Sequence, residues 1–322
     1  MSSTPSIEVR VQSTRWEAEG IVSLELVRTD GAMLPAFAAG AHIDMELPNG
    51  ISRSYSLMND PTETHRYVVA VNRDPASRGG SKFIHDALRC GDRLQISAPG
   101  NNFPLEESAG HTVLFAGGIG VTPLLCMARR LQALGRSWEI WYSARTRSVA
   151  ACIDALMALD AAAGGNRVHL NFDQAPGGRM LDLEALVGAC APDTHVYCCG
   201  PLPMLAAFEK ACAARDQATV HVEYFSSATP VAAEGGYTVV LSRSGRSIEV
   251  TPGKTILDAM LDSDIDVPYS CMEGVCGTCE LRVIEGLPDH RDLVLSKEER
   301  AANKSLMVCC SGSLTPRLVL DW

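Results

Sequence analysis

Four cysteines near the end of this chain restrict how it can fold more than any other feature. Cys271, Cys276 and Cys279 are separated by four and then two residues, and Cys309 follows after a further 29 residues. This spacing places three thiols on one tight loop. The fold must then return a distant fourth thiol to that loop, so residue 309 is expected to lie beside residues 271–279.

The cysteine spacing is the ligand pattern of a plant-type [2Fe–2S] cluster. Gly274 and Gly277 lie within the loop, where glycine permits a positive φ and a close approach of backbone N–H groups to sulfur. Neighbouring residues of a strand face opposite sides, so only one of Cys309 and Cys310 can point at the loop, and the ferredoxin-like spacing favours Cys309. The predicted cluster ligands are Cys271, Cys276, Cys279 and Cys309.

The same cysteines also fit a structural zinc site, a disulfide pair, or buried unreactive thiols. Zinc sites usually combine two short ligand pairs, whereas the second half of this pattern is a single cysteine followed directly by another. Residues 237–322 resemble the ferredoxin family of β-grasp domains. That resemblance favours the cluster over the alternatives.

The composition indicates a soluble globular protein of more than one domain. The 322 residues are 46% hydrophobic and 20% charged, and this length predicts two or three domains. A formal net charge of −10 gives no electrostatic reason to bind nucleic acid or anionic lipid. Residues 1–8 do not resemble a secretory signal, and glycines and Pro123 interrupt the apolar stretch 111–128. We therefore expect a cytoplasmic protein that does not enter a membrane and whose thiols are kept reduced.

The hydrophobic pattern divides the chain into segments of different character. Residues 1–107 show short alternating runs between turn residues, which predict an antiparallel β-barrel or sandwich. Residues 108–226 alternate β-runs with helical periods, which predicts a parallel α/β sheet flanked by helices. Residues 227–236 are rich in small and turn-forming residues and predict a linker. The ferredoxin-like segment 237–322 begins with an expected hairpin and a short helix.

A glycine turn follows the first β-run of the α/β segment. Gly117, Gly118 and Gly120 let the backbone approach a pyrophosphate, and a helix N-terminus adds free N–H groups and the positive end of its dipole. Pro123 stands where the third glycine of the dinucleotide fingerprint would be. Alone, the turn also fits an ordinary connection between a strand and a helix.

A second motif of this kind is Cys199-Gly200-Pro201, which again follows a β-run and opens a helix. Together the two motifs resemble the pyridine-nucleotide domain of the ferredoxin–NADP reductase superfamily, in which the second motif lies against the nicotinamide. Without its Gly-Pro neighbours, Cys199 would be read as a small core residue. The resemblance implies nucleotide contacts at Gly118, Ile119, Gly120, Thr122, Cys199, Gly200 and Pro201.

Two motifs in the first segment resemble the flavin-binding barrel of the same superfamily. Arg53-Ser54-Tyr55-Ser56 matches its R-x-Y-S/T motif, in which an aromatic residue covers the flavin ring and the arginine lies near the phosphate. Ser77-Arg78-Gly79-Gly80-Ser81 precedes a helical run and suits a second anion site. Each motif alone also fits an exposed strand or a plain capped loop. The implied flavin contacts are Arg53, Ser54, Tyr55, Ser56, Val71, Asn72, Arg73, Arg78, Gly79, Gly80 and Ser81.

The remaining candidates concern the nucleotide's adenosine end and the flavin face. Ser143 and Arg145 follow the second β-run of the α/β segment, where the adenosine ribose is expected, and an arginine there suits a 2′-phosphate. Asp173, after the third β-run, would repel that phosphate, and the family resemblance favours NADH. In the superfamily an aromatic residue near the end of this segment lies over the flavin. Phe225 is the candidate, Tyr224 is the alternative, and either also suits core packing.

The order of flavin barrel, nucleotide domain and C-terminal ferredoxin resembles the phthalate dioxygenase reductase and vanillate demethylase reductase family over essentially the whole chain. The resemblance implies a monomer that uses FMN, NADH and a [2Fe–2S] cluster and passes electrons in the order NADH, FMN, cluster. The implied partner is a terminal Rieske non-haem iron oxygenase acting on an aromatic substrate. It also implies that Cys199, Thr122 and Phe225 lie where hydride transfer takes place.

Other functions compete with this one. A reductase that feeds a different acceptor fits the same motifs, and a redox-sensing regulator would keep the cofactors only as switches, although no spare effector domain is visible. A hydrolase is disfavoured because the G-x-S-x-G and H-E-x-x-H motifs are absent from the sequence. An acidic face of the ferredoxin segment could steer a basic partner or could simply be solvated; its residues are Asp258, Asp262, Asp264, Asp266 and Glu273.

Overall fold

The structure, a computed structural model, describes residues 6–75, 77, 79–226 and 229–322. The chain forms two compact units, residues 1–223 and residues 224–322. The first unit contains the expected barrel and the expected α/β sheet, and the second contains the ferredoxin-like segment. Within the described residues, none of the helices has both the length and the apolar character needed to cross a membrane.

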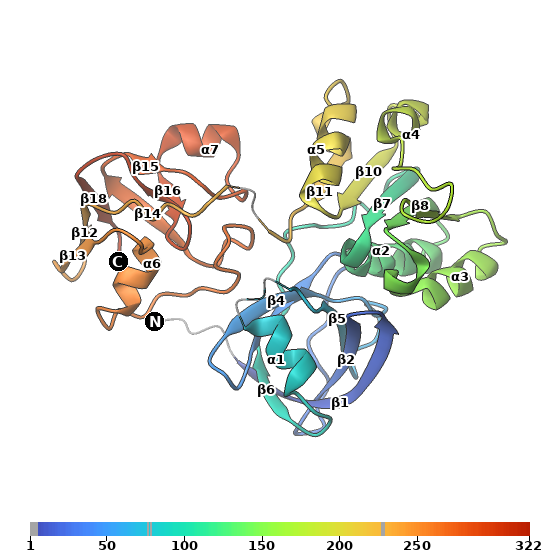
Figure 1. The fold of residues 1–322 in the computed structure, drawn as a ribbon, viewed down its shortest axis with the longest axis horizontal. Coiled ribbons are helices and arrows are strands. Elements are labelled where there is room, and N and C mark those ends of the chain that lie inside the picture. Colours follow the sequence, from blue (N-terminus) through green and yellow to red (C-terminus); the bar gives the residue numbers. More distant parts are fainter. Residues whose placement is uncertain (1–5, 76, 78, 227–228) are drawn as a thin grey trace. The chain divides into compact units, whose positions relative to one another are not determined.

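The first unit begins with a curled antiparallel sheet of six strands in the order β4-β3-β6-β1-β2-β5 (Figure 1). A bridge between Leu57 and Val69 joins the chain after β4 to β5, which brings the two edge strands together. Alternate residues such as Val9, Val11 and Ile43 are buried and form its core. The elements are β1 (Ile7–Ala18), β2 (Ile21–Arg28), β3 (His42–Glu46), β4 (Ser52–Ser56), β5 (Tyr67–Asn72), α1 (Gly80–Asp86) and β6 (Arg93–Ile96).

The rest of the first unit is a parallel sheet of five strands in the order β11-β10-β7-β8-β9. Strands β8 and β9 are added on one side of β7, and β10 and β11 on the other, so the strand order reverses between β7 and β10. In open α/β sheets, ligands bind outside the carboxyl ends of the strands at such a reversal. The elements are β7 (His111–Gly117), η1 (Gly118–Gly120), α2 (Val121–Ala133), β8 (Ser137–Ala144), η2 (Arg147–Val149), α3 (Ile153–Ala162), β9 (Val168–Phe172), α4 (Leu183–Ala189), β10 (His195–Cys199), α5 (Leu202–Ala211), η3 (Gln217–Thr219) and β11 (Val220–Glu223).

Helix α2 joins the barrel to the parallel sheet. Its side chains share one hydrophobic core with sheet residues and with Ala39, Met58 and Phe103 from the barrel side. Gly40 allows a close approach at this junction, since a Cβ on it would lie 1.9 Å from the carbonyl oxygen of Phe103 and 3.1 Å from Cε of Met127. The barrel and the sheet therefore form one packed body, which fixes their cofactor motifs relative to each other.

The second unit is built around a five-stranded mixed sheet in the order β13-β12-β18-β14-β16. Strand β18 pairs in parallel with β12 and antiparallel with β14, so it lies in the middle of the sheet. Helix α6 starts with a capping box, in which Thr255 and Asp258 each accept a backbone N–H of the other. The elements are β12 (Tyr237–Leu241), β13 (Ser247–Val250), α6 (Ile256–Leu261), β14 (Glu280–Glu285), β15 (Pro288–Asp289), α7 (Lys297–Ala302), β16 (Ser305–Met307), β17 (Gly312–Ser313) and β18 (Arg317–Leu320).

The observed architecture confirms the fold class expected from the sequence: an antiparallel barrel, a parallel α/β sheet and a β-grasp unit. Part of the expected linker is packed onto the second unit. The N–H of Ala232 donates to the carbonyl of Cys310 at 2.7 Å, and Ala232 itself is buried. The carbonyl of Ala233 accepts from Gly253 at 2.8 Å.

Candidate functional site

Both predicted nucleotide motifs lie at the strand reversal of the parallel sheet. Gly118 to Gly120 follow β7, and Cys199 to Pro201 follow β10, with Cys199 paired opposite Ala116. A Cβ on Gly120 would lie 2.2 Å from the carbonyl oxygen of Cys199, and one on Gly117 would lie 2.6 Å from Cδ of Pro201. The two motifs are therefore in backbone contact, and glycine is required where they meet.

The hydroxyl of Thr122 stabilises the glycine turn from inside. Thr122 is buried in the first turn of α2, and its Oγ1 donates to the carbonyl oxygen of Ile119 at 3.0 Å. Gly118, with a φ of 53°, adopts the left-handed conformation at the start of the turn. The structure thus places Thr122 beneath the turn, where it holds the shape of the loop.

Cys199 is fully buried and lies beside a carboxyl group that the sequence analysis did not single out. Cys199 and Glu223 are opposite each other on β10 and β11, so the thiol lies beside the carboxyl group. Burial raises the pKa of Glu223 to about 8 and raises the pKa of Cys199 well above its ordinary value. Neither the alternation of residues nor a motif indicates that the Glu223 carboxyl group is buried. Only its position opposite Cys199, at the end of the neighbouring strand, could have indicated this burial.

The residues predicted for the adenosine end gather at the carboxyl ends of β8 and β9. Asn171 donates to Ser143 Oγ at 3.1 Å, and the N–H of Asp173 donates to the carbonyl of Ala144 at 3.1 Å. Arg145 is exposed. Among the described residues, the buried Oδ1 of Asp173 has no hydrogen-bond partner. This orphaned acceptor at the nucleotide edge of the sheet suits a ribose hydroxyl.

The two predicted flavin motifs meet at the start of α1. A Cβ on Gly80 would lie 2.8 Å from Cγ and 3.2 Å from Nε of Arg53, so the arginine side chain lies directly on this glycine. Gly79 has a φ of 102°, and Ser81 Oγ accepts the N–H of Asp74 at 3.3 Å. Arg78 lies outside the described residues. A guanidinium held against a glycine-rich loop suits a phosphate group.

Residues of β4 divide between the two faces of the strand. Ser54 donates to Asp44 Oδ1 at 2.6 Å, and Ser56 is buried. Tyr55 packs against the barrel core, and burial raises its pKa to about 12 although Arg53 lowers it. The Tyr55 and Arg53 side chains therefore share the face opposite to that of Ser54, as the flavin motif requires.

The predicted contacts that follow β4 have different surroundings. Val71 is buried and its carbonyl is hydrogen-bonded to His85 Nε2 at 3.0 Å, whereas Asn72 is exposed. Arg73 forms a half-exposed ion pair with Asp86 of α1 at 2.9 Å. The Arg73 charge is therefore already partly neutralised within the protein.

Phe225 lies at the start of the second unit, just after β11, and 39% of it is exposed.

The four cysteines predicted as cluster ligands come together in the second unit. The thiol of Cys271 lies beside those of Cys276 and Cys309, and the thiol of Cys279 lies beside that of Cys309. Donation from these thiols and from backbone N–H groups lowers the pKa of Cys271; the N–H of Glu273 lies 3.3 Å from its Sγ. The backbone N–H groups remain donors after the thiols lose their protons, and they stabilise the thiolate, which is the form that binds iron.

The four cysteines are linked in one series of contacts, from Cys276 to Cys271, Cys309 and Cys279. Among the described residues, no group of three or more His, Cys, Asp or Glu side chains is arranged to hold a single metal ion. Structural zinc requires four ligands around one centre, whereas the four thiolates of a [2Fe–2S] cluster are shared between two irons. The cysteine spacing, with three thiols on one loop and a distant fourth, is the one that a [2Fe–2S] cluster uses.

Cys310 does not join this group of four thiols in the same way. Its Sγ lies 3.8 Å from the carbonyl of Met307, and a Cβ on Gly274 would be 2.5 Å from it. Gly274 has a φ of 71°. Cys310 thus packs behind the cysteine loop while Cys309 reaches the other ligands, which supports the choice made from the sequence.

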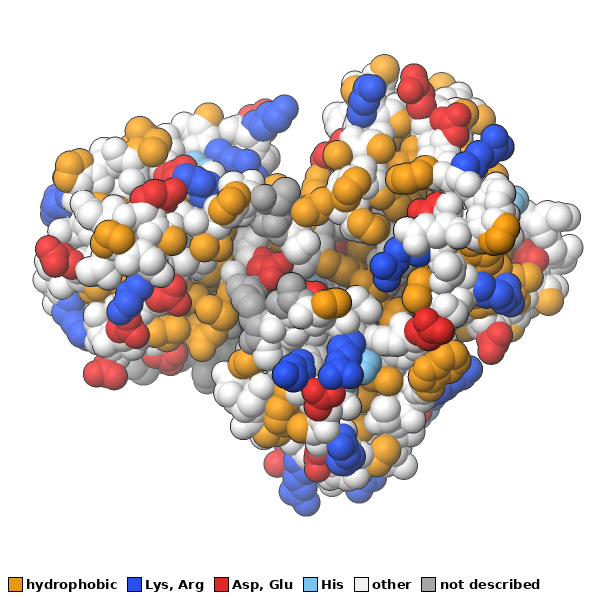
Figure 2. All heavy atoms as spheres, in the orientation of Figure 1, with side chains coloured by type: hydrophobic (Ala, Val, Ile, Leu, Met, Phe, Trp, Pro, Cys, Tyr) orange, Lys and Arg blue, Asp and Glu red, His pale blue; other side chains and the backbone are white. Residues whose placement is uncertain are grey.

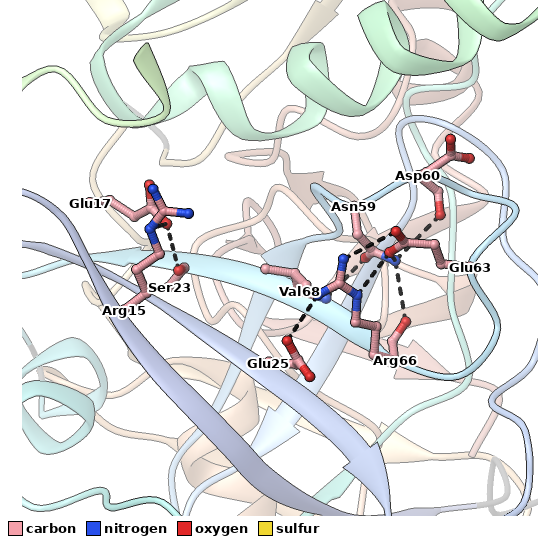
Figure 3. A network of polar contacts seen from close by, with 9 residues as sticks. All are labelled: Arg15, Glu17, Ser23, Glu25, Asn59, Asp60, Glu63, Arg66 and Val68. Carbon is pink, nitrogen blue, oxygen red and sulfur yellow. Dashed lines mark hydrogen bonds and ion pairs between the residues drawn. The ribbon is translucent and has the colours of Figure 1, made fainter. Parts of the chain in front are cut away.

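A polar cleft of about 510 Å³ lies elsewhere in the first unit, between barrel strands and helices α2 and α3. Figure 3 shows its network: Arg66 pairs with Glu25 at 2.9 Å and with Glu63 at 3.0 Å, and Ser23 donates to Glu17 at 2.7 Å. Among the described residues that line the cleft, none is a site residue predicted from the sequence. The cleft is therefore distinct from the motif-bearing edge of the sheet.

Comparison with known proteins accounts for the whole chain. Residues 239–312 match the family described as "2Fe-2S iron-sulfur cluster binding domain". The chain is 50% identical to phenoxybenzoate dioxygenase subunit beta of Ectopseudomonas oleovorans, over 98% of this chain and 97% of that protein. It is 48% identical to tetrachlorobenzoquinone reductase of Sphingobium chlorophenolicum, over 98% of each.

A solved structure shows the same architecture from end to end. It is the crystal structure titled "Phthalate dioxygenase reductase: a modular structure for electron transfer from pyridine nucleotides to [2Fe-2S]". Its chain is 38% identical to this one, and the two superpose with a TM-score of 0.79 over 98% of each chain. This chain belongs to the phthalate dioxygenase reductase family. Membership in the family confirms the resemblance inferred from the motifs and their order.

Membership also confirms the predicted type of activity. The chain is an oxidoreductase of the kind that serves as the reductase component of oxygenase systems, as the names of its full-length relatives indicate. The individual flavin, nucleotide and cluster contacts stay predictions. Most of these residues lie together at three places: the strand reversal of the parallel sheet, the start of α1 and the cysteine loop of the second unit.

Proposed function

We propose that this protein is the NADH-dependent reductase component of a two-component Rieske-type aromatic oxygenase, with FMN and a [2Fe–2S] cluster as its cofactors. The observation that carries the proposal is the convergence of Cys271, Cys276, Cys279 and Cys309 in a chain that also holds both nucleotide motifs at the strand reversal. When bound, the flavin accepts two electrons together from NADH and releases them singly to the cluster.

The role of the first unit is to bind and orient the flavin and NADH. Arg53 on Gly80, with Ser81 and Arg78 nearby in sequence, binds the FMN phosphate, and Tyr55 lies on the same face of β4 for the flavin ring. The glycine turn after β7 binds the nucleotide pyrophosphate, and Thr122 keeps that turn in shape. Cys199, Gly200 and Pro201 position the nicotinamide. Their contact with the turn fixes the position of the nicotinamide site relative to the pyrophosphate site.

The adenosine end selects NADH over NADPH. The buried Oδ1 of Asp173 accepts a hydrogen bond from a ribose hydroxyl, and the same charge repels a 2′-phosphate. Arg145 is exposed and lies on the neighbouring strand end, so it supplies only a partial counter-charge. Phe225 remains the candidate for the aromatic residue that would cover the flavin ring when FMN is bound.

The second unit delivers single electrons to the terminal oxygenase, and the protein acts as a cytoplasmic monomer. On the face drawn in Figure 2, acidic, basic and apolar side chains of the second unit are interspersed, so its described residues form no single acidic patch there. Recognition of the partner therefore depends on shape and apolar contact near the cluster loop as well as on charge.

The purified protein tests the proposal directly. Acid extraction should release FMN, the visible spectrum should show flavin together with a [2Fe–2S] centre, and NADH should bleach both in sequence. A candidate Rieske oxygenase mixed with catalytic amounts of the protein and NADH should become reduced. Extraction of FAD, a colourless zinc protein, or failure to reduce any co-expressed Rieske protein would each contradict a separate part of the proposal.

A second candidate function is reduction of a quinone. The relative that is 48% identical over the whole chain is named tetrachlorobenzoquinone reductase. A chlorinated quinone added to the protein and NADH distinguishes the two functions. If quinone reduction far exceeds the reduction of every oxygenase tested, and persists after loss of the cluster in Cys276→Ser, the quinone is the physiological acceptor.

A further inference from the structure

Asp292 carries a carboxylate in the interior of the second unit, next to the cysteine loop. It lies between β15 and α7, and its side chain is fully buried. Its Oδ2 accepts the N–H groups of Val294 at 3.1 Å and Leu295 at 2.8 Å. A buried charge is retained only where hydrogen bonds and counter-charges offset the loss of water. The two N–H donors fix the backbone of residues 292–295 around this carboxylate.

Two cationic or ionisable side chains lie near the same carboxylate, at distances longer than a direct hydrogen bond. Arg300 Nη2 lies 3.8 Å from Oδ2 and also donates to the backbone carbonyl of Asp292, and His290 Nδ1 lies 3.8 Å from Oδ1. Among the described residues, Asp292 Oδ1, His290 Nδ1 and Arg300 Nε are buried atoms with no hydrogen-bond partner. Three such atoms therefore lie close together around one buried carboxylate.

The segment that Asp292 fixes lies directly on the two glycines between the ligand cysteines. The N–H of Leu293 donates to the carbonyl of Gly274 at 2.8 Å, and a Cβ on Gly274 would lie 3.0 Å from Cα of Asp292. Cγ1 of Val294 is the atom nearest to a Cβ on Gly277, at 3.5 Å. Any movement of residues 292–294 is therefore transmitted to the loop that carries Cys271, Cys276 and Cys279.

We infer that Asp292 is a positioning residue for the [2Fe–2S] site, where it holds the cysteine loop in shape and lowers the reduction potential of the cluster through its buried charge. The inference rests on the proposed function. The first effect follows from the two N–H bonds and the Leu293–Gly274 bond. The second follows because a negative charge in a poorly solvated interior opposes the addition of an electron nearby.

Two substitutions separate these effects. Asp292→Asn removes the charge and keeps an oxygen that can accept the N–H groups of Val294 and Leu295, whereas Asp292→Ala removes both. Asp289→Asn is the matched control, because Asp289 carries the same charge three residues earlier but is paired with Arg291 at 2.7 Å. All variants are made in the full chain, and far-UV circular dichroism checks that each is folded.

The readouts are the cluster midpoint potential, the electron paramagnetic resonance spectrum of the reduced cluster, and the rate of cluster loss to an iron chelator. We expect Asp292→Asn to keep the cluster with a more positive potential than wild type, and Asp292→Ala to lose it several-fold faster with altered g values. Asp289→Asn should match wild type in all three. If Asp292→Ala does not fold, the potential of Asp292→Asn decides alone.

Potentials and spectra of both Asp292 variants that equal those of Asp289→Asn would overturn the inference. A wild-type protein without a [2Fe–2S] signal would instead contradict the proposed function. The two failures are therefore distinguishable in the same set of samples.

Discussion

The thiol of Cys199 lies beside the carboxyl group of Glu223 where parallel strands β10 and β11 end side by side. Cys199 is fully buried, and among the described residues the second carboxylate oxygen, Oε2, has no hydrogen-bond partner. The pair lies next to Gly200 and Pro201, the motif assigned to the nicotinamide. A carboxyl group in this position keeps its proton at neutral pH, which the following substitution tests.

Replacing Glu223 with Gln should change how stability depends on pH. Burial raises the pKa of Glu223 to about 8 from 4.5, so the folded state binds a proton that the unfolded state has lost. Stability from this group is present below pH 4.5 and is lost as pH rises toward 8 and beyond. Thermal unfolding from pH 5 to 9 should show a steeper decline for wild type than for Glu223→Gln. The exposed Glu184→Gln serves as control, and equal slopes in all three proteins would contradict the assignment.

Cys276→Ser should abolish the [2Fe–2S] absorbance almost completely and leave reduction of the flavin by NADH unchanged. The thiol of Cys276 contacts Cys271 in the second unit, whereas the flavin and nucleotide motifs lie in the first. Anaerobic stopped-flow spectra at flavin and cluster wavelengths give both rates. Cys310→Ser is the control and should keep the cluster. Loss of flavin reduction along with the cluster would contradict the division of labour between the units.

Arg53→Ala should weaken FMN retention more than NADH binding. The Arg53 side chain lies on Gly80, and loss of a charge-assisted contact to phosphate removes about 1.5–3 kcal/mol, or roughly 10- to 100-fold in affinity. Fluorescence titration of the apoprotein with FMN measures the effect. Arg10→Ala, which removes an exposed arginine of the same barrel, should bind FMN like wild type. A larger loss of NADH affinity than of FMN affinity would reject the barrel assignment.

Asp173→Asn should reduce the preference for NADH over NADPH. The substitution removes the charge that repels a 2′-phosphate and keeps an oxygen near the ribose, so kcat/KM for NADPH should rise by about tenfold, equivalent to about 1.4 kcal/mol. Steady-state assays with both coenzymes and an artificial acceptor measure the ratio. Arg145→Ala is the companion variant and should lower NADPH use relative to wild type. An unchanged ratio in Asp173→Asn would show that another group selects the coenzyme.

Gly120→Ala should destabilise the first unit and impair nucleotide binding together. The added methyl would lie 2.2 Å from the carbonyl oxygen of Cys199 and 2.8 Å from the nitrogen of Gly200, and both are backbone atoms that cannot rotate away. Overpacking of this kind costs about 1–3 kcal/mol. Gly188→Ala in α4 meets nothing within 4 Å and should be neutral or slightly stabilising. Equal melting temperatures for the two variants would contradict the close approach of the motifs.

The sequence predicted the fold class and most elements because their signals are local. Strand β9 (Val168–Phe172) lies in the segment expected to alternate strands and helices, and the cysteine spacing correctly required residue 309 to return to the loop. Strand β1 alternates buried and exposed residues only near its start and continues to Ala18 through mostly exposed residues. No alternation in the sequence reveals that this second part pairs with β2.

The sequence analysis missed the residues whose importance depends on burial by distant elements. Glu223 and Asp292 are ordinary acidic residues in the sequence, and only the packing of β10 against β11, or of residues 290–295 on the cysteine loop, buries their carboxylates. The polar cleft around Arg66 was missed for the same reason. Its lining comes from strands and helices that are far apart along the chain.

The central position of strand β18 in the second unit has a consequence for how the protein is made. Residues 317–320 lie between β12 and β14 and pair with both strands. The sheet therefore cannot form across its centre until these residues have emerged from the ribosome. The first unit can fold during translation, but the thiols of Cys271 and Cys309 cannot be held together until synthesis has passed residue 320. We therefore expect cluster assembly to follow translation of this segment, and a chain that lacks β18 to keep a folded first unit with unassembled cysteines.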